Sequence, residues 1–322
     1  MRKFTMRIGI LMLCVCICGV PAWGAEYLIP VGQVIGLELT DNTVTVAAID
    51  EELGANAKAA GLCPGDKILS IDGKEISCAE DVKLALRRSQ GTVALKLQRK
   101  DKLHTVMFQP QITADGPKLG LLLKEKVTGI GTVTWYDPEQ KTFGTLGHGV
   151  SGPDGRLLQM TGGSAYGANV VSVTRGKAGK PGQLRGSLCA KEPIGQLTAN
   201  TDQGLFGTCE GGWSGSPLPV AQPEDVKTGA ATIYSTIEGD RVREYSVEIL
   251  KIYPHTKTKD RNLVIRVTDP ELLAATGGIV QGMSGSPIIQ DGKLVGAVTH
   301  VLVNDPTTGY GIFIENMLDA AA

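Results

Sequence analysis

Serine and histidine residues in two glycine-rich segments are the side chains of this chain best suited to chemistry. Residues Gly282–Pro287 read Gly-Met-Ser-Gly-Ser-Pro, and residues Gly144–Gly149 set His148 among glycines. A serine on a tight glycine turn can expose its hydroxyl, and a histidine can accept the proton of that hydroxyl. Ser284 and His148, with the histidine first in the chain, therefore predict nucleophilic catalysis by a serine that a histidine activates.

The sequence Ser-Gly-Ser-Pro occurs twice, at Ser214–Pro217 and at Ser284–Pro287. The second copy is followed by an apolar strand, an Asp-Gly turn at 291–292 and another apolar strand, which is the pattern of a β-hairpin. In chymotrypsin-like enzymes such a hairpin follows the nucleophile and lines the substrate pocket. We therefore predict Ser284 as the nucleophile and interpret Gly212–Gly215 as a structural turn.

Such a mechanism also needs oxyanion donors and a general base. We predict the backbone N–H groups of Gly282 and Ser284 as the oxyanion hole, in which one donor can be worth about 10²–10³ in rate. His300, which ends the hairpin after Ser284, is the rival base. His148 is favoured because glycines flank it and because its position fits the histidine-first order.

Two aspartates are candidates for the acid that holds the histidine in the correct tautomer. Asp269 precedes the nucleophile by 284 − 269 = 15 residues. In a chymotrypsin-like double barrel the acid usually comes from the first barrel, which favours Asp202. Spacing alone leaves both aspartates open.

Residues 27–109 form the first candidate domain. Turn sequences at 64–66 and 72–73 bracket a short alternating strand, and a Ser-x-x-Glu capping box at 77–80 begins a helix with one apolar side. On the run Ala60–Leu69 and the Asp-Gly turn, the segment resembles a bacterial PDZ domain, which binds an extended peptide at a sheet edge.

The PDZ resemblance implies a groove with Ile35, Gly36 and Leu37 as its carboxylate-binding loop and the capped helix as its other wall. A PDZ fold that only packs against its neighbour is the alternative interpretation.

The rest of the chain is rich in strands. Residues 110–118 contain two prolines and a glycine and are predicted to be a linker. In residues 119–322 apolar runs alternate with turns, and helical patterns are confined to the end and to a short stretch near 270–276, which is typical of an all-β barrel or sandwich. We therefore expect a mainly β chain, in which an α+β PDZ domain precedes a chymotrypsin-like β-barrel serine peptidase domain.

Composition and the N-terminal segment indicate which ligands and which location the protein can have. The formal net charge is −1, so no basic field favours nucleic acid. Residues 1–24 are predicted to be a signal peptide or a signal anchor, because basic residues precede the uncharged apolar run 8–20 and a small-x-small site at 22–24. Four cysteines lie beyond this segment, and their disulfide state is left open: Cys63, Cys78, Cys189 and Cys209. No motif indicates a metal or another cofactor.

Several motifs together resemble the SpoIVB peptidase family. They are Phe143–Gly149, Gly282–Ile288, Gly292–Val301 and Asn304–Ile312, with Ile314-Glu315 following. The resemblance runs from the apolar N-terminus through the PDZ segment to the end of the chain, and these motifs are more specific than the PDZ match.

The family resemblance implies a serine endopeptidase that endospore formers export across the forespore membrane into the intermembrane space. It cleaves itself and then a membrane-bound regulator, and this triggers intramembrane proteolysis and late sigma-factor activation. The resemblance places the catalytic acid near the nucleophile and so assigns that role to Asp269, with His148 as base and Ser284 as nucleophile. Implied partners are a protein substrate, the enzyme's own N-terminal region and no nucleic acid.

Two other functions fit parts of the pattern. A quality-control protease of the HtrA kind usually places its PDZ domain after the protease, whereas here the PDZ segment comes first. A non-enzymatic PDZ adaptor predicts that Ser284→Ala changes nothing.

Overall fold

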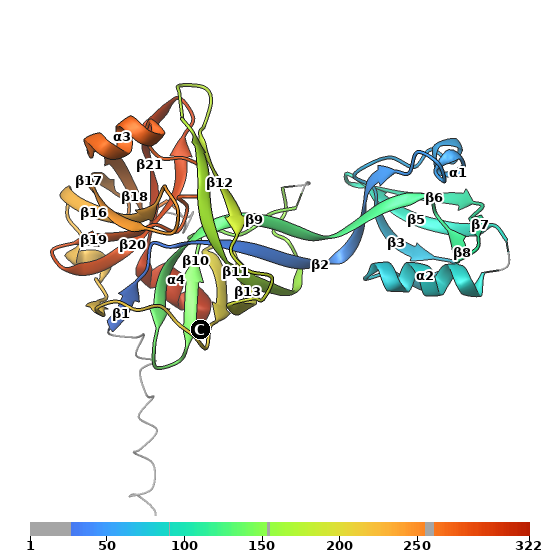
Figure 1. The fold of residues 1–322 in the computed structure, drawn as a ribbon, viewed down its shortest axis with the longest axis horizontal. Coiled ribbons are helices and arrows are strands. Elements are labelled where there is room, and N and C mark those ends of the chain that lie inside the picture. The colour runs from blue at the N-terminus through green and yellow to red at the C-terminus, as the bar shows by residue number, and fades with distance from the viewer. Residues whose placement is uncertain (1–26, 90, 153–154, 255–260) are drawn as a thin grey trace, which may run out of the picture.

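In the computed structural model, two β-barrels lie together and a smaller α+β unit stands apart from them, joined by two long strands (Figure 1). The structure describes residues 27–89, 91–152, 155–254 and 261–322. The predicted signal segment 1–24 lies outside these residues. In the described ranges, no helix has the length and apolarity that a membrane crossing requires.

The first barrel consists of six strands. Neighbouring strands pair in the order β9-β10-β14-β13-β11-β2, and an additional pairing of β2 with β9 closes the ring. The strands are β2 (Val34–Ile49), β9 (Leu121–Asp137), β10 (Thr142–Thr145), β11 (Met160–Thr174), β13 (Gly195–Thr201) and β14 (Gly204–Thr208). Alternate residues of these strands point inward, as expected for a pleated strand. They form a core that includes Ile35, Leu37, Val133, Phe143 and Leu205.

The second barrel is closed in the strand order β16-β17-β18-β21-β20-β19. Its strands are β16 (Gly229–Thr236), β17 (Val242–Ile252), β18 (Leu263–Val267), β19 (Pro287–Gln290), β20 (Lys293–Leu302) and β21 (Asp305–Phe313). The predicted hairpin after Ser284 is β19–β20, and its Asp291 has a φ of 50°, as an Asp-Gly turn requires. The prediction of a β-rich domain with a chymotrypsin-like barrel is therefore confirmed.

Shorter elements join or flank the barrels. The C-terminal helix α4 (Ile314–Ala321) packs on β14, β20 and β21, and so contacts both barrels. Strand β12 (Gln183–Leu188) forms a projecting hairpin with β11. The remaining elements here are β1 (Tyr27–Pro30), β15 (Leu218–Pro219), the 3-10 turn η1 (Pro223–Asp225) and α3 (Pro270–Thr276).

The smaller unit is the PDZ fold, and it is inserted between β2 and β9. It contains α1 (Ala55–Ala59), β3 (Lys67–Ile71), β4 (Lys74–Glu75), α2 (Ala79–Arg88), β5 (Val93–Arg99), β6 (Lys102–Phe108), β7 (Gln111–Thr113) and β8 (Gly116–Lys118). The far ends of β2 and β9 complete it, since Thr45 to Ile49 pair with Lys124 to Leu121. Its core is separate from that of the barrels.

One ion pair ties the PDZ unit together across its sheet. The Asp66 side chain is 1% exposed and accepts hydrogen bonds from Arg99 Nε at 2.6 Å and Nη2 at 2.8 Å. Burial by itself raises the pKa of Asp66, but the bonds from Arg99 and from the Cys63 N–H outweigh it and hold this pKa below its ordinary value.

The structure corrects the domain boundaries that we expected from the sequence. Residues 34–40, assigned above to the PDZ domain 27–109, pair with β9 and β11 in the first barrel, because their inward side chains belong to its core. The expected linker 110–118 forms the hairpin β7–β8 instead. The peptidase barrel therefore begins before the PDZ unit and resumes after it, rather than starting at residue 119.

Candidate active site

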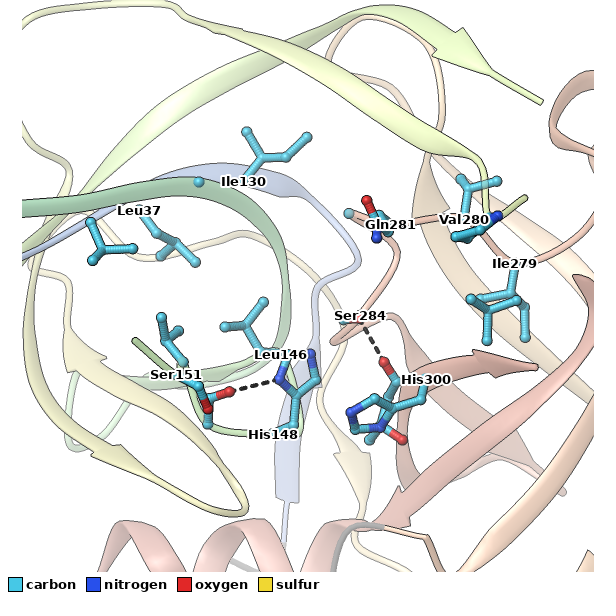
Figure 2. Close-up of a pocket in the computed structure, with 18 of the residues that line it drawn as sticks. Leu37, Ile130, Leu146, His148, Ser151, Ile279, Val280, Gln281, Ser284 and His300 are labelled. Carbon is cyan, nitrogen blue, oxygen red and sulfur yellow. Dashed lines mark hydrogen bonds between the residues drawn. The ribbon is translucent and has the colours of Figure 1, made fainter. Parts of the chain in front are cut away.

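A cavity of about 470 Å³ lies between the two barrels and contains both residues predicted for catalysis. His148 follows β10 of the first barrel, and Ser284 precedes β19 of the second. Figure 2 shows the His148 imidazole near Ser284, with His300 next to it on the same side of the serine. The structure thus brings together the predicted nucleophile and the predicted base, which are far apart in the sequence.

A tight turn after β10 presents His148 to the cavity. Leu146, a buried residue, has a φ of 70°, which is uncommon for a side chain of this size and indicates a conformation that the surrounding structure imposes. The Nδ1 atom of His148 lies 2.9 Å from the carbonyl oxygen of Gly149 (Figure 2). Because a carbonyl can only accept, Nδ1 carries the proton, which is the tautomer that a base acting through Nε2 needs.

His300 lies against His148. The centroids of the two rings are 4.8 Å apart and the ring planes are tilted by 37°. His300 is on β20 and lines the same cavity. The sequence analysis treated His300 as an alternative to His148, whereas in the structure the two rings lie side by side.

The turn that carries Ser284 is held from behind by β9. The Thr132 N–H donates to the Ser284 carbonyl at 3.0 Å, and the Thr132 hydroxyl donates to the Gly282 carbonyl at 2.8 Å. Gly285 has a φ of 96°, and a Cβ there would lie 2.0 Å from the Thr132 carbonyl oxygen, so only glycine fits. Thr132 is fully buried, and we identify it as a support of the catalytic turn.

The backbone amides of the Ser284 turn differ in whether they donate a hydrogen bond within the protein. The Gly285 N–H donates to Val298 O and the Ser286 N–H to Met283 O. Over the described residues, the backbone hydrogen bonds of the turn use neither the Gly282 N–H nor the Ser284 N–H as donor. These are the two amides that the sequence predicted for the oxyanion hole.

The hydroxyl of Ser284 currently has another acceptor. Its Oγ donates to the backbone carbonyl of Thr299 at 2.6 Å (Figure 2). A neutral hydrogen bond of this kind contributes about 1 kcal/mol net, so turning the hydroxyl toward His148 is an inexpensive step.

The expectation that Asp269 orients His148 is not met by the structure. Its carboxylate caps α3, accepting from the Leu272 N–H at 2.9 Å and from the Ser246 N–H at 3.4 Å. Asp269 is not among the residues that line the cavity. The sequence Asp-Pro-Glu explains this position, because aspartate is a favoured N-cap and proline is a favoured first residue of a helix.

The rival acid, Asp202, lies on the exposed turn between β13 and β14. The end of β13 packs behind the histidine loop, since Asn200 Oδ1 accepts from the Val150 N–H and Asn200 Nδ2 donates to Val150 O, both at 2.9 Å. Asp202 itself does not line the cavity. Gly149 O, which lies 2.9 Å from Nδ1, helps to orient the His148 imidazole.

The first Ser-Gly-Ser-Pro copy lies outside the cavity. Trp213, next to Ser214, packs edge-on against Tyr136 and Phe143 at centroid distances of 5.6 and 5.3 Å, and its Nε1 donates to Gln33 Oε1 at 2.9 Å. The segment is a turn that packs on the first barrel, as the sequence analysis interpreted it.

The loop predicted to bind a peptide carboxylate does not border the PDZ groove. Ile35 and Leu37 are 0% and 5% exposed in the first barrel, and Gly36 pairs there with Tyr166 and Ile130. The groove beside α2, about 530 Å³ in volume, is lined instead by Leu119–Leu123 at the start of β9. The apolar-Gly-apolar sequence that borders α2 is therefore Leu119-Gly120-Leu121.

Two six-stranded barrels with a serine and a histidine across their shared cleft define a serine peptidase of chymotrypsin-like architecture. The family model described as SpoIVB peptidase S55 matches residues 116–318, and the chain belongs to this family. The PDZ domain model matches residues 29–98. The protein is thus a serine endopeptidase with a PDZ domain.

Comparisons with individual proteins are more distant. The protein named "Putative zinc metalloprotease R01501" of Rhizobium meliloti (strain 1021) is 32% identical over 101 residues, which is 31% of this chain and 26% of that protein. A protein from Helicobacter pylori (strain J99 / ATCC 700824), named as a zinc metalloprotease in the same terms, is 29% identical over 101 residues, which is 30% of this chain and 27% of that protein. The chain thus spans about a quarter of the length of these relatives. The Rv3671c protease of M. tuberculosis in its active form superposes with a TM-score of 0.35 at 16% identity, covering 62% of this chain and 73% of that chain.

Within the described ranges, no group of three or more His, Cys, Asp and Glu side chains could hold a metal ion. The cysteines Cys63, Cys78, Cys189 and Cys209 are all free thiols in this structure.

Proposed function

We propose that this peptidase is exported across the forespore membrane, or anchored in it through residues 8–20, and acts in sporulation. There it cleaves itself and a membrane-bound regulator of an intramembrane protease, which activates a late sigma factor. Membership of the SpoIVB peptidase family, together with Ser284 and His148 facing each other across one cleft, is the observation that supports this proposal.

The chemistry begins when the Ser284 hydroxyl leaves Thr299 O and turns to His148 Nε2. The exchange costs about 1 kcal/mol, or about fivefold in rate. His148 then takes the proton as Oγ attacks the substrate carbonyl, while its Nδ1–H stays bonded to Gly149 O. The oxyanion of the tetrahedral intermediate is held by the amides of Gly282 and Ser284.

The second half of the reaction reuses the same groups. His148 gives its proton to the leaving amine, and the acyl group remains on Ser284 Oγ. Water then enters, loses a proton to His148 and attacks the ester, which releases the acid and restores the serine. Thr132 holds the turn in place throughout, because its two hydrogen bonds fix the carbonyls of Gly282 and Ser284.

Labelling with a fluorophosphonate tests the nucleophile. We expect a covalent adduct on Ser284 of the full chain, identified by mass spectrometry of the modified peptide, and no adduct in His148→Ala. An adduct on Ser214 would overturn the choice of nucleophile. A folded protein without any adduct would favour a PDZ adaptor.

The PDZ groove in this proposal binds an extended peptide, with the enzyme's own N-terminal region as the first ligand to test. The first residues of β9, from Leu121, pair with β2 on one side, and their other side faces the groove toward α2. A peptide can therefore add to the edge of β9 that faces the groove. Leu122 lines the groove and is 55% exposed.

Because Leu122 is exposed, Leu122→Asp should fold and should lose binding of a peptide spanning residues 1–26. The matched control is Leu103→Asp on β6, where the leucine is 61% exposed outside the groove. Titration of the fluorescent peptide by anisotropy measures both variants. Equal binding by wild type and Leu122→Asp would remove the PDZ groove from the proposal.

A further inference from the structure

We propose that the cleft selects a peptide bond with aliphatic side chains on both sides. The residue that supplies the attacked carbonyl, here called the acyl-side residue, contacts Ile279, Val280 and Val301. The residue that supplies the departing amine, the leaving-side residue, contacts Leu37 and Leu146. This inference rests on the proposed roles of Ser284 and His148.

The direction of the bound peptide follows from the proton transfers. His148 must reach the departing amine, so the leaving segment lies on the same side of Ser284 as His148, toward the first barrel. The acyl segment lies on the opposite side, toward the second barrel. Figure 2 shows Leu37, Ile130 and Leu146 on the His148 side, and Ile279, Val280 and Gln281 on the other.

The acyl-side wall is apolar and firmly held. Ile279 and Val280 are 2% and 1% exposed, so their positions are set by the second-barrel core. The Ile279 N–H donates to Pro306 O at 2.7 Å, and Val280 O accepts from the Met283 N–H at 3.1 Å. Val301 lines the same cavity from β20 and packs against the second-barrel core to which Ile279 and Val280 belong.

No charged partner faces this wall. Among the described residues that line the cavity, the titratable side chains are the two histidines, His148 and His300. A charged acyl-side residue would lose its water without gaining a counter-ion, whereas an aliphatic one would bury apolar surface. We expect discrimination on the order of 100-fold, the size that a shaped apolar pocket commonly reaches.

The leaving-side wall continues away from the catalytic residues. Leu37, Thr128, Gly129 and Ile130 line both the catalytic cavity and a neighbouring cavity of about 760 Å³, which extends to β12. An extended peptide can therefore run without interruption from the cleft along β9. This continuity gives the cleft room for an extended substrate segment beyond the scissile bond.

A peptide library tests the inference. The full chain is incubated with peptides randomised on both sides of a central bond, and mass spectrometry gives the cleavage sites. We expect aliphatic residues on both sides, with charged acyl-side residues disfavoured about 100-fold. Efficient cleavage after charged residues would refute the inference.

A designed change of specificity gives the sharper test. Val301→Asp should move the acyl-side preference toward lysine and arginine and leave the leaving-side preference unchanged. Val303→Asp, at a cavity residue that is 49% exposed, provides a second variant if the first misfolds. The control Val171→Asp, where the valine is 63% exposed outside the cleft, should keep the wild-type preference.

The outcomes distinguish failure of the aliphatic pocket from failure of the serine mechanism. Labelling at Ser284 with unchanged specificity in both cavity variants would refute the aliphatic pocket and leave the serine mechanism intact. Absence of both labelling and cleavage in the folded wild type would refute the proposed function and this inference with it.

Discussion

Replacing Thr132 by valine should impair catalysis without unfolding the protein. Valine keeps the shape and the backbone N–H, so the bond to Ser284 O persists, but the hydroxyl bond to Gly282 O at 2.8 Å is lost. A buried acceptor left without its partner costs about 1–3 kcal/mol. If that cost falls on the oxyanion turn, kcat/KM drops about 5- to 150-fold.

Strand β9 offers a matched control two residues along. Thr134 is also 0% exposed, yet its hydroxyl has no hydrogen-bond partner among the residues that the structure describes. Thr134→Val therefore removes an unsatisfied group, and its stability and kcat/KM should equal or exceed those of the wild type. The two variants differ only in whether the lost hydroxyl contacts the catalytic turn.

The assay combines kinetics on a fluorogenic peptide, the rate of fluorophosphonate labelling of Ser284, and urea unfolding. For Thr132→Val we expect slower labelling and lower kcat, with KM nearly unchanged, because the turn acts on the transition state. Equal kcat/KM in the Thr132 and Thr134 variants would refute the idea that β9 supports the oxyanion hole.

Three further predictions follow from contacts described above. Asp269→Asn should retain most activity, because asparagine also caps a helix. If Asp269 were the acid of a catalytic triad, the same substitution would lower kcat about 10⁴-fold. Peptide kinetics of Asp269→Asn and Asp269→Ala separates helix capping from catalysis. Folding lowers the pKa of Asp66 from its ordinary value of 3.8. The ionised carboxylate therefore stabilises the PDZ unit fully above pH 3.8, and this stabilisation is lost as the pH falls through the lower pKa of the folded state. Urea unfolding from pH 5 to 2 should show this loss, and Asp66→Asn, which breaks the pair with Arg99, should destabilise the unit by about 2–3 kcal/mol at pH 7 and flatten the profile. Gly285→Ala should abolish labelling of the nucleophile, since its Cβ would collide with β9; a normal labelling rate would show that the turn can relax.

Local patterns made the catalytic turn and its hairpin predictable. The Ser284 turn, the Asp291 turn and the glycine-flanked His148 each depend on neighbours within a few residues. The Asp269 cap had an equally local signal, but the family resemblance pointed to catalysis instead. Local sequence is informative where the backbone conformation itself is the constraint.

Long-range pairing could not be predicted in the same way. Ile35-Gly36-Leu37 and Leu119-Gly120-Leu121 share one apolar-Gly-apolar pattern, and only the register of β2 against β9 decides which lies beside α2. Thr132 reaches its partner Gly282 across 150 positions of the chain. Its role follows from closure of the first barrel, which no short sequence pattern encodes.

The insertion of the PDZ unit between β2 and β9 has a consequence for how this protein can be divided. A fragment beginning at residue 119 would lack β2, and the first barrel would be left with β9 and β11 as open edges, which favour aggregation. In the folded chain, the PDZ unit is the closed end of one very long hairpin of β2 and β9. Removing the PDZ unit therefore requires a short turn in its place, joining residue 40 to residue 126, where the barrel part of the ladder ends.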